Sequence, residues 1–68
     1  MISAGICVIH IYSAVVFKVL YIDINGILLL PYRKETKMWD KENITRLHPS
    51  SVNKIHEVQC PRARRDDE

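Results

Sequence analysis

The sequence predicts a small membrane-associated protein, built from an N-terminal apolar helix, a short β-hairpin and a polar tail that is partly helical and partly disordered. Three observations lead to this fold class. Residues 1–32 carry only Lys18 and Asp23 as charges, whereas residues 33–68 carry nine Lys or Arg and seven Asp or Glu. Residues 1–22 are almost wholly apolar. A chain of 68 residues buries a small fraction of its surface, and it usually needs a disulfide, a metal, a partner or a membrane for stability.

Residues 1–22 form the candidate transmembrane segment. As a helix they would extend about 33 Å, enough to cross a bilayer, and eleven of them are Ile, Val, Leu or Phe. His10 and Lys18 make insertion less favourable, although a lysine near a helix end can reach the interface. No Lys or Arg precedes the segment and several follow it, so the positive-inside rule predicts a single-pass protein with a cytosolic C-terminus.

The same stretch has a competing β interpretation. Eleven of residues 1–27 are Ile or Val, which favour strands. In this interpretation the chain is a small soluble β-rich binding module, and residues 1–32 make a three-stranded sheet covered by a helix of the tail. Such a sheet would be apolar on both faces and would need cover on both, which one weak helix does not provide.

Residues 23–32 are predicted to form a turn and a hairpin. Asn25 and Gly26 lie between two apolar runs, and Asn-Gly is the strongest short hairpin signal because both turn residues take positive φ. A two-residue turn at this point places Asp23 opposite Leu28.

The remainder of the chain is expected to be a polar tail. Pro31 should end the second strand or confine it to a sheet edge. Residues 33–59 are predicted to be a charged tail with short helices, in which the adjacent Met38 and Trp39 lack apolar partners one helical turn away and are candidate interaction residues. Residues 60–68 have almost no apolar content and are predicted to be disordered.

The stretch "KVLYIDINGILL", residues 18–29, resembles the first motif of the haloacid dehalogenase superfamily, in its carboxy-terminal-domain phosphatase-like branch. The resemblance implies that Asp23 matches the nucleophile, which forms an aspartyl-phosphate in the presence of magnesium. Asn25 stands at the position of the general acid/base, a role that an amide cannot perform at neutral pH. Gly26 matches the turn glycine, and Ile27 stands where Thr is usual.

The other parts expected of that family have no match in the sequence. These are a Ser or Thr after a second strand, a distant Lys, and a magnesium-binding acidic pair; Asp66 and Asp67 do not follow a strand. A parallel sheet also needs crossovers of a dozen or more residues. The resemblance therefore implies a truncated, inactive fragment with Asp23 as a vestigial nucleophile. Its place beside Asn-Gly favours a carboxylate that flanks a turn and bonds local backbone N–H groups.

The two cysteines and the histidines predict neither a disulfide nor a metal site. Cys7 is expected to be a small buried hydrophobe and Cys60 a free surface thiol, since two cysteines make no disulfide framework and no Cys-x-x-Cys pair. His48, His56 and Cys60 give the spacing His-x7-His-x3-Cys, but a structural zinc site uses four ligands. No metal and no cofactor are predicted.

Charge and motifs also bear on modification and partners. The net charge of +2, with basic residues interleaved with acids, does not favour nucleic acid. Asn43-Ile44-Thr45 is a glycosylation sequon, which matters only if the tail lies in the lumen. The distribution of Lys and Arg predicts the cytosolic side instead.

The sequence assigns no activity. The favoured hypothesis is a single-pass membrane protein, not an enzyme, that contacts membrane lipid and a membrane protein partner through Met38, Trp39 and the apolar segment. The alternatives are an inactive fragment of a haloacid-dehalogenase-type phosphatase and a small soluble β-rich binding module.

Overall fold

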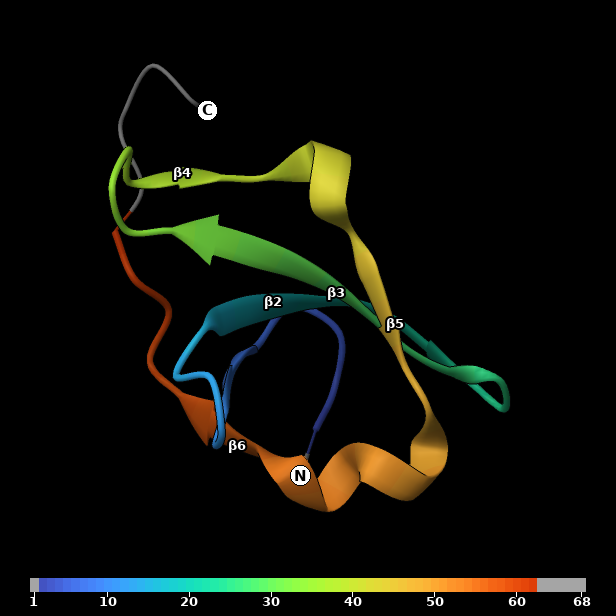
Figure 1. Cartoon of the computed structure of the whole chain (residues 1–68). Helices are drawn as coiled ribbons and strands as arrows, with labels where there is room; N and C mark the ends of the chain where they lie inside the picture. Colours follow the sequence, from blue (N-terminus) through green and yellow to red (C-terminus); the bar gives the residue numbers. More distant parts are fainter. Residues whose placement is uncertain (1, 63–68) are drawn as a thin grey trace.

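The computed structural model describes residues 2–62, which form six strands and two 3-10 helices (Figure 1). The strands are β1 (Cys7–His10), β2 (Val16–Asp23), β3 (Gly26–Arg33), β4 (Met38–Trp39), β5 (Thr45–Leu47) and β6 (Ile55–Val58). The 3-10 helices are η1 (Lys41–Asn43), between β4 and β5, and η2 (Pro49–Lys54), between β5 and β6.

The strands pair as one antiparallel sheet that curves around its interior. Its order is β4-β3-β2-β1-β6, and β5 also pairs with β3, on residues nearer the start of that strand than those paired with β4. The segment from β5 through η2 to β6 therefore returns from one side of the sheet to the other (Figure 1). The Ile- and Val-rich first half supplies the long strands, because branched side chains pack well on a pleated surface.

The predicted apolar helix over residues 1–22 is wrong. This stretch contains β1 and most of β2, joined by a loop over residues 11–15. Within residues 2–62, no helix has both the length and the apolar character needed to cross a bilayer. The predicted membrane-associated fold, single-pass topology and membrane location rested on that helix and are contradicted with it. The physical reason is that residues of this stretch pair as strands, and Val8 and Val19 pack into a core shared with neighbouring strands.

The main core lies on the inner face of the curved sheet. It consists of Val8, Val19, Ile27, Leu29 and Ile55, which come from four different strands. Further apolar side chains pack against this cluster while remaining partly exposed: Ile2, Ile6, Phe17 and Leu47. The curvature lets the sheet cover its own inner face, which a flat three-stranded sheet with one helix could not do.

Residues 59–62, which we call the C-terminal strap, are attached to the outer face of the sheet at two points. Cys7 and Leu30 are buried, at 1% and 8% exposure, yet neither belongs to the main core cluster. Cys7 pairs with Val58 of β6, and a disulfide joins it to Cys60, so the prediction of a buried Cys7 and a free surface thiol at Cys60 is wrong for Cys60. The Tyr32 hydroxyl donates to the Arg62 carbonyl at 3.2 Å, which fixes the far end of the strap. The predicted disorder over residues 63–68 lies outside the described residues.

The β2–β3 hairpin exists, but its register differs from the predicted one. Asp23 pairs with Gly26, so the two turn residues are Ile24 and Asn25. Neither of them has a positive φ, and Gly26 takes that role with a φ of 137°. A Cβ on Gly26 would also overlap the Leu47 carbonyl. The glycine thus serves the close approach of β5, and the Asn-Gly pair does not form the turn by itself.

Pro31 lies inside the central strand β3, contrary to the prediction of a strand end or a sheet edge. It pairs with Phe17 on β2, and its carbonyl accepts a hydrogen bond from the Asp40 N–H at 2.8 Å on the other side. That other side is where η1 separates β4 from β5. A proline donates no backbone hydrogen bond. Its lack of an N–H costs little here because the neighbouring strand is interrupted by η1 at this position.

One apolar stretch of the hairpin is exposed. Leu20, Tyr21, Ile22 and Ile24 are each more than a third exposed, and Ile24 reaches 93%. The register between β1 and β2 ends at Lys18. In the part of the chain that the structure describes, no strand pairs with this end of β2 on the β1 side. We call residues 20–24, which are the last four residues of β2 and the first residue of the turn, the open end of β2.

Candidate binding pocket

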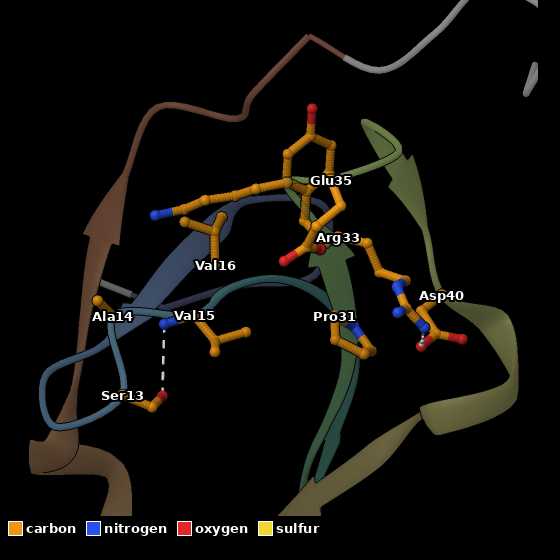
Figure 2. Close-up of a pocket in the computed structure, with 10 residues that line it drawn as sticks. Ser13, Ala14, Val15, Val16, Pro31, Arg33, Glu35 and Asp40 are labelled. Atoms are coloured by element: carbon orange, nitrogen blue, oxygen red, sulfur yellow. Dashed lines mark hydrogen bonds and ion pairs between the residues drawn. The ribbon is translucent and has the colours of Figure 1, made fainter.

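A pocket of about 410 Å³ opens between the β1–β2 loop and the end of β3 (Figure 2). Its first wall is the loop and its second is the end of β3 with the turn that follows, and Asp40 closes one side. Ligand pockets in proteins have volumes of this order and combine apolar surface with a few polar groups. The lining residues are Ser13, Ala14, Val15, Val16, Pro31, Tyr32, Arg33, Lys34, Glu35 and Asp40.

Local hydrogen bonds shape the loop wall. The His10 ring Nδ1 lies 3.3 Å from the Ser13 N–H and 3.2 Å from the Ser13 hydroxyl. The Val15 N–H donates to Ser13 Oγ at 3.3 Å, a bond drawn in Figure 2. Ala14 has a φ of 60° and donates its N–H to the His10 carbonyl at 2.8 Å. These bonds fix the loop and place the side chains of Val15 and Val16 along the pocket (Figure 2).

The second wall is held by aromatic and backbone contacts. Tyr32 pairs with Trp39 across the β3–β4 ladder, and their rings meet edge to face at 5.1 Å between centroids. The Lys18 ammonium lies 4.7 Å from the centroid of the Trp39 ring, a cation–π contact that is common for such pairs. The half-buried Trp39 therefore packs on the ring of Tyr32, which lines the pocket.

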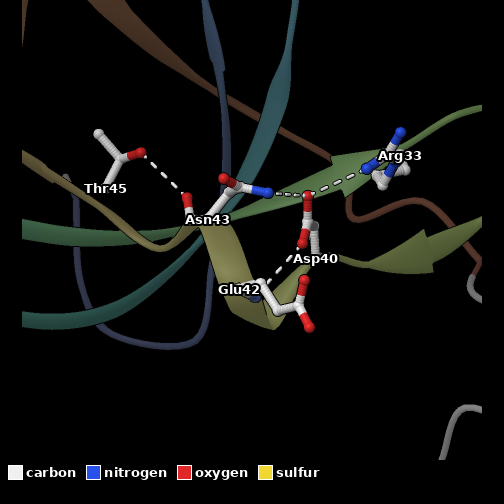
Figure 3. A network of polar contacts seen from close by, with 5 residues as sticks. All are labelled: Arg33, Asp40, Glu42, Asn43 and Thr45. Atoms are coloured by element: carbon white, nitrogen blue, oxygen red, sulfur yellow. Dashed lines mark hydrogen bonds and ion pairs between the residues drawn. The ribbon is translucent and has the colours of Figure 1, made fainter.

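Arg33 and Asp40 form the charged part of the rim. Arg33 Nη1 lies 3.4 Å from Asp40 Oδ2, and their side chains are 56% and 14% exposed. Asp40 also accepts hydrogen bonds from Asn43 Nδ2 at 2.6 Å and from the Glu42 N–H at 3.3 Å, so that it caps η1 (Figure 3). The hydrogen bond from Asn43 is the main reason that the pKa of the Asp40 carboxyl lies below its ordinary value of 3.8, with smaller contributions from Glu42 and Arg33; partial burial acts in the opposite direction.

The pocket holds no recognisable catalytic apparatus among the described residues. The contact between Ser13 and His10 is the nearest to one, but it joins residues three apart within an exposed loop. An activated serine needs a base that is itself oriented, commonly by a carboxylate. The His10 ring contacts Ser13 and the ring of Tyr12, neither of which carries a carboxylate. Residues 2–62 also contain no group of three His, Cys, Asp or Glu side chains placed to hold a metal ion.

Asp23 lies at the end of β2, away from the pocket-lining residues. Its Oδ1 accepts the Asn25 N–H at 2.8 Å and lies 3.5 Å from Arg46 Nη1. The local bond is the one expected of a carboxylate that flanks a turn. Asn25 and Gly26 lie beside it in the turn and at the start of β3.

The other residues singled out in the sequence are dispersed. Met38 and Trp39 form β4 and are half-buried against β3. His48 caps η2 by accepting the Ser50 N–H. His56 lies on β6 and Cys60 is in the disulfide.

The pocket could hardly be predicted from the sequence. Val15 and Val16 belong to an apolar run in which inward-facing and outward-facing positions have the same composition. On the rim, Arg33 and Asp40 are seven positions apart, and their contact depends on the turn between β3 and β4. The one local signal was Asp40 two residues before Glu42 and three before Asn43, since Asp is a preferred cap.

No protein-family model matches the chain, and neither a curated protein nor a solved structure matches it. The fold and pocket therefore define a class only, a small disulfide-linked antiparallel β-domain.

Proposed function

We propose that this chain is a non-catalytic binding module that takes a short extended peptide into the pocket between the β1–β2 loop and β3. The observation that carries the proposal is the composition of the pocket, which has apolar walls from Val15, Val16 and Pro31 beside a rim with a half-exposed Arg33. Such a surface accommodates one apolar side chain and offers hydrogen bonds to the peptide next to it.

The charged residues on the pocket rim determine which peptide we expect to bind. Asp40 receives three hydrogen-bond donors and is mostly covered, so it serves to hold Arg33 in place. The Arg33 guanidinium has five N–H donors, and a planar guanidinium suits carbonyl and carboxylate oxygens. The favoured ligand is therefore an apolar residue followed by an acidic residue or a free C-terminal carboxylate.

Peptide selection on the folded, oxidised chain tests this proposal. Peptides selected from a random library should share an apolar residue followed by a carboxylate. On binding, they should shift the backbone amide NMR signals of residues 13–16 and 32–35. Val15→Lys should abolish binding, because a charged side chain would enter the apolar wall. Val52→Lys is the matched control, since Val52 is exposed on η2 and outside the pocket.

Arg33→Gln should weaken the binding of peptides with a carboxylate at least tenfold, consistent with the loss of one charge-assisted hydrogen bond of about 1.5–3 kcal/mol. Signals that move at the open end of β2 instead, or equal losses for Val15→Lys and Val52→Lys, would contradict the pocket as the site. Failure to select any peptide would contradict the proposal as a whole.

A further inference from the structure

We propose that Asn43 is an acceptor for N-linked glycosylation and carries a glycan that covers the free edge of β5. The sequence Asn43-Ile44-Thr45 meets the acceptor pattern. The structure adds three observations to this pattern: the exposure of the site, a disulfide elsewhere in the chain, and an unpaired strand edge immediately after the asparagine.

The acceptor lies where a glycan can be accommodated. Asn43 is the last residue of η1, and Asn43, Ile44 and Thr45 are all exposed. The Asn43 amide donates to Asp40 at 2.6 Å, while the Thr45 hydroxyl donates to the Asn43 carbonyl at 3.1 Å (Figure 3). An asparagine amide nitrogen carries two hydrogens. Glycosylation replaces one of them, so the other can keep the bond to Asp40 while the sugar extends into solvent.

The disulfide indicates the compartment in which such a modification occurs. Cys7 and Cys60 are 53 residues apart and are joined, and both cysteines of the chain are thereby bonded. Disulfides form and persist in oxidising compartments and are rare in the cytosol. N-linked glycans are added to chains that enter the secretory pathway. The crosslink and the sequon therefore point to the same setting, although they involve different residues and different chemistry.

The glycan would cover a part of the fold that is otherwise open. Among the described residues, β5 pairs with β3 alone, so its second edge has no partner strand. Ile44, directly before β5, is 43% exposed. Unpaired edges invite pairing with other chains, and folded proteins commonly cover or block them. A bulky sugar on Asn43 lies next to this edge and would block the approach of a second strand.

The chemical step is a substitution at the first carbon of the sugar. Asn43 Nδ2 forms a bond to the anomeric carbon of an oligosaccharide carried on a lipid diphosphate. The bond from that carbon to the phosphate oxygen breaks, the diphosphate leaves with the electron pair, and Nδ2 releases one proton. Because Asp40 engages Nδ2 in the folded protein, we expect transfer to occur before η1 has formed.

The experiment is translation of the full chain behind a cleavable secretory leader in the presence of microsomes, followed by mass spectrometry. The expected product gains one oligosaccharide, which a glycan-releasing amidase removes while converting Asn43 to aspartate. Thr45→Ala and Asn43→Gln should abolish the gain, whereas Thr45→Ser should retain it. Thr45→Ser is the matched control because it keeps a hydroxyl at the position.

A second sequon shows whether the chain has reached the lumen. Lys34→Asn places Asn before Glu35 and Thr36 in the exposed turn between β3 and β4 and so creates an acceptor with one substitution. Modification at position 34 without modification at position 43 would overturn the proposal. So would a wild-type chain that is protected from added protease inside the microsomes, with its disulfide formed and Asn43 unmodified.

Discussion

The two faces of the sheet are stabilised in different ways. On the inner face, five apolar side chains from four strands pack on one another, and no covalent bond contributes. On the outer face, Cys7 and Leu30 are buried, and the C-terminal strap is attached to this face by the Cys7–Cys60 disulfide and by the bond from the Tyr32 hydroxyl to the Arg62 carbonyl. Side-chain packing stabilises the inner face, and a disulfide holds the strap on the outer face.

The difference shows how a chain of this size manages a sheet that is apolar on both sides. A small domain cannot build two complete cores. Here the sheet curves to cover its inner face, and four residues after β6 cross its outer face. The strap is short and has little apolar area of its own, so its contacts alone would not offset the entropy of ordering it. The following changes test how far the two faces differ.

The largest effect should come from removing the crosslink. Closing a loop of 53 residues in the unfolded chain corresponds to about 4 kcal/mol in the chain-entropy model. Cys7→Ala combined with Cys60→Ala should therefore lower the free energy of unfolding by about 4 kcal/mol, measured by urea titration. Reduction of the wild-type chain is the control and should give a similar loss. An unfolding midpoint that reduction leaves unchanged would show that the strap holds without its disulfide.

The next largest losses of stability are expected from truncating two adjacent leucines that face opposite sides of the sheet. Leu29, 2% exposed in the main core, and Leu30, 8% exposed and outside the main core cluster, are both buried leucines on β3. Leu29→Ala should lower the free energy of unfolding by about 3–4 kcal/mol, whereas Leu30→Ala should lower it by about 2 kcal/mol. The loss is smaller for Leu30 because its side chain is less completely buried and lies outside the main core cluster. Equal losses in urea unfolding would contradict this distinction between the faces.

Gly26→Ala tests the contact between the hairpin and β5. The φ of 137° is unfavourable for a residue with a side chain, and the new Cβ would overlap the Leu47 carbonyl. We expect a loss of about 1–3 kcal/mol in the free energy of unfolding, together with displaced NMR signals in β5. Gly5→Ala is the comparison, since Gly5 also has a positive φ of 97° but has nothing within 4 Å of the added Cβ. The variant at Gly26 should therefore be the more destabilised of the two.

The smallest effect concerns pH. The folded-state pKa of Asp40 lies below 3.8, first because of the hydrogen bond from Asn43. Folding thus favours the ionised form, so this contribution to stability is complete above about pH 4 and is lost as pH falls through the folded-state pKa. Asn43→Ala should raise the pKa of Asp40 toward its ordinary value, as read from NMR titration of the side-chain carboxyl signal. Glu35→Gln removes a neighbouring charge without touching these hydrogen bonds and serves as the control. A carboxyl pKa that Asn43→Ala leaves unchanged would show that this bond does not set it.

Several features of the fold were accessible from the sequence, and they were local. The high content of Ile and Val over residues 1–27 supported the competing β interpretation, which the structure favours over the predicted helix. The expectation that Asp23 flanks a turn matches its bond to the Asn25 N–H. The hairpin between two apolar runs was also predicted correctly. Its register was not, because Gly26 is needed where β5 approaches, and that approach depends on residues twenty positions away.

Other features had no local signal. An apolar run of 22 residues satisfies the requirements of a membrane span and of two paired strands equally well, and only the presence of partner strands distinguishes them. The disulfide was missed for the same kind of reason: Cys7 and Cys60 meet because β1 pairs with β6, which places Val58 beside Cys7 two residues before Cys60.

The sequence by itself determined the strand preference of its Ile- and Val-rich half, where the charges lie and which residues can cap a turn, since these depend on neighbours within a few positions. The tertiary structure decided the curvature of the sheet, the face that each strand buries, the disulfide and the pocket. Each of these joins residues far apart in the chain, and the free energy that selects them comes from pairing and packing that no single segment contains.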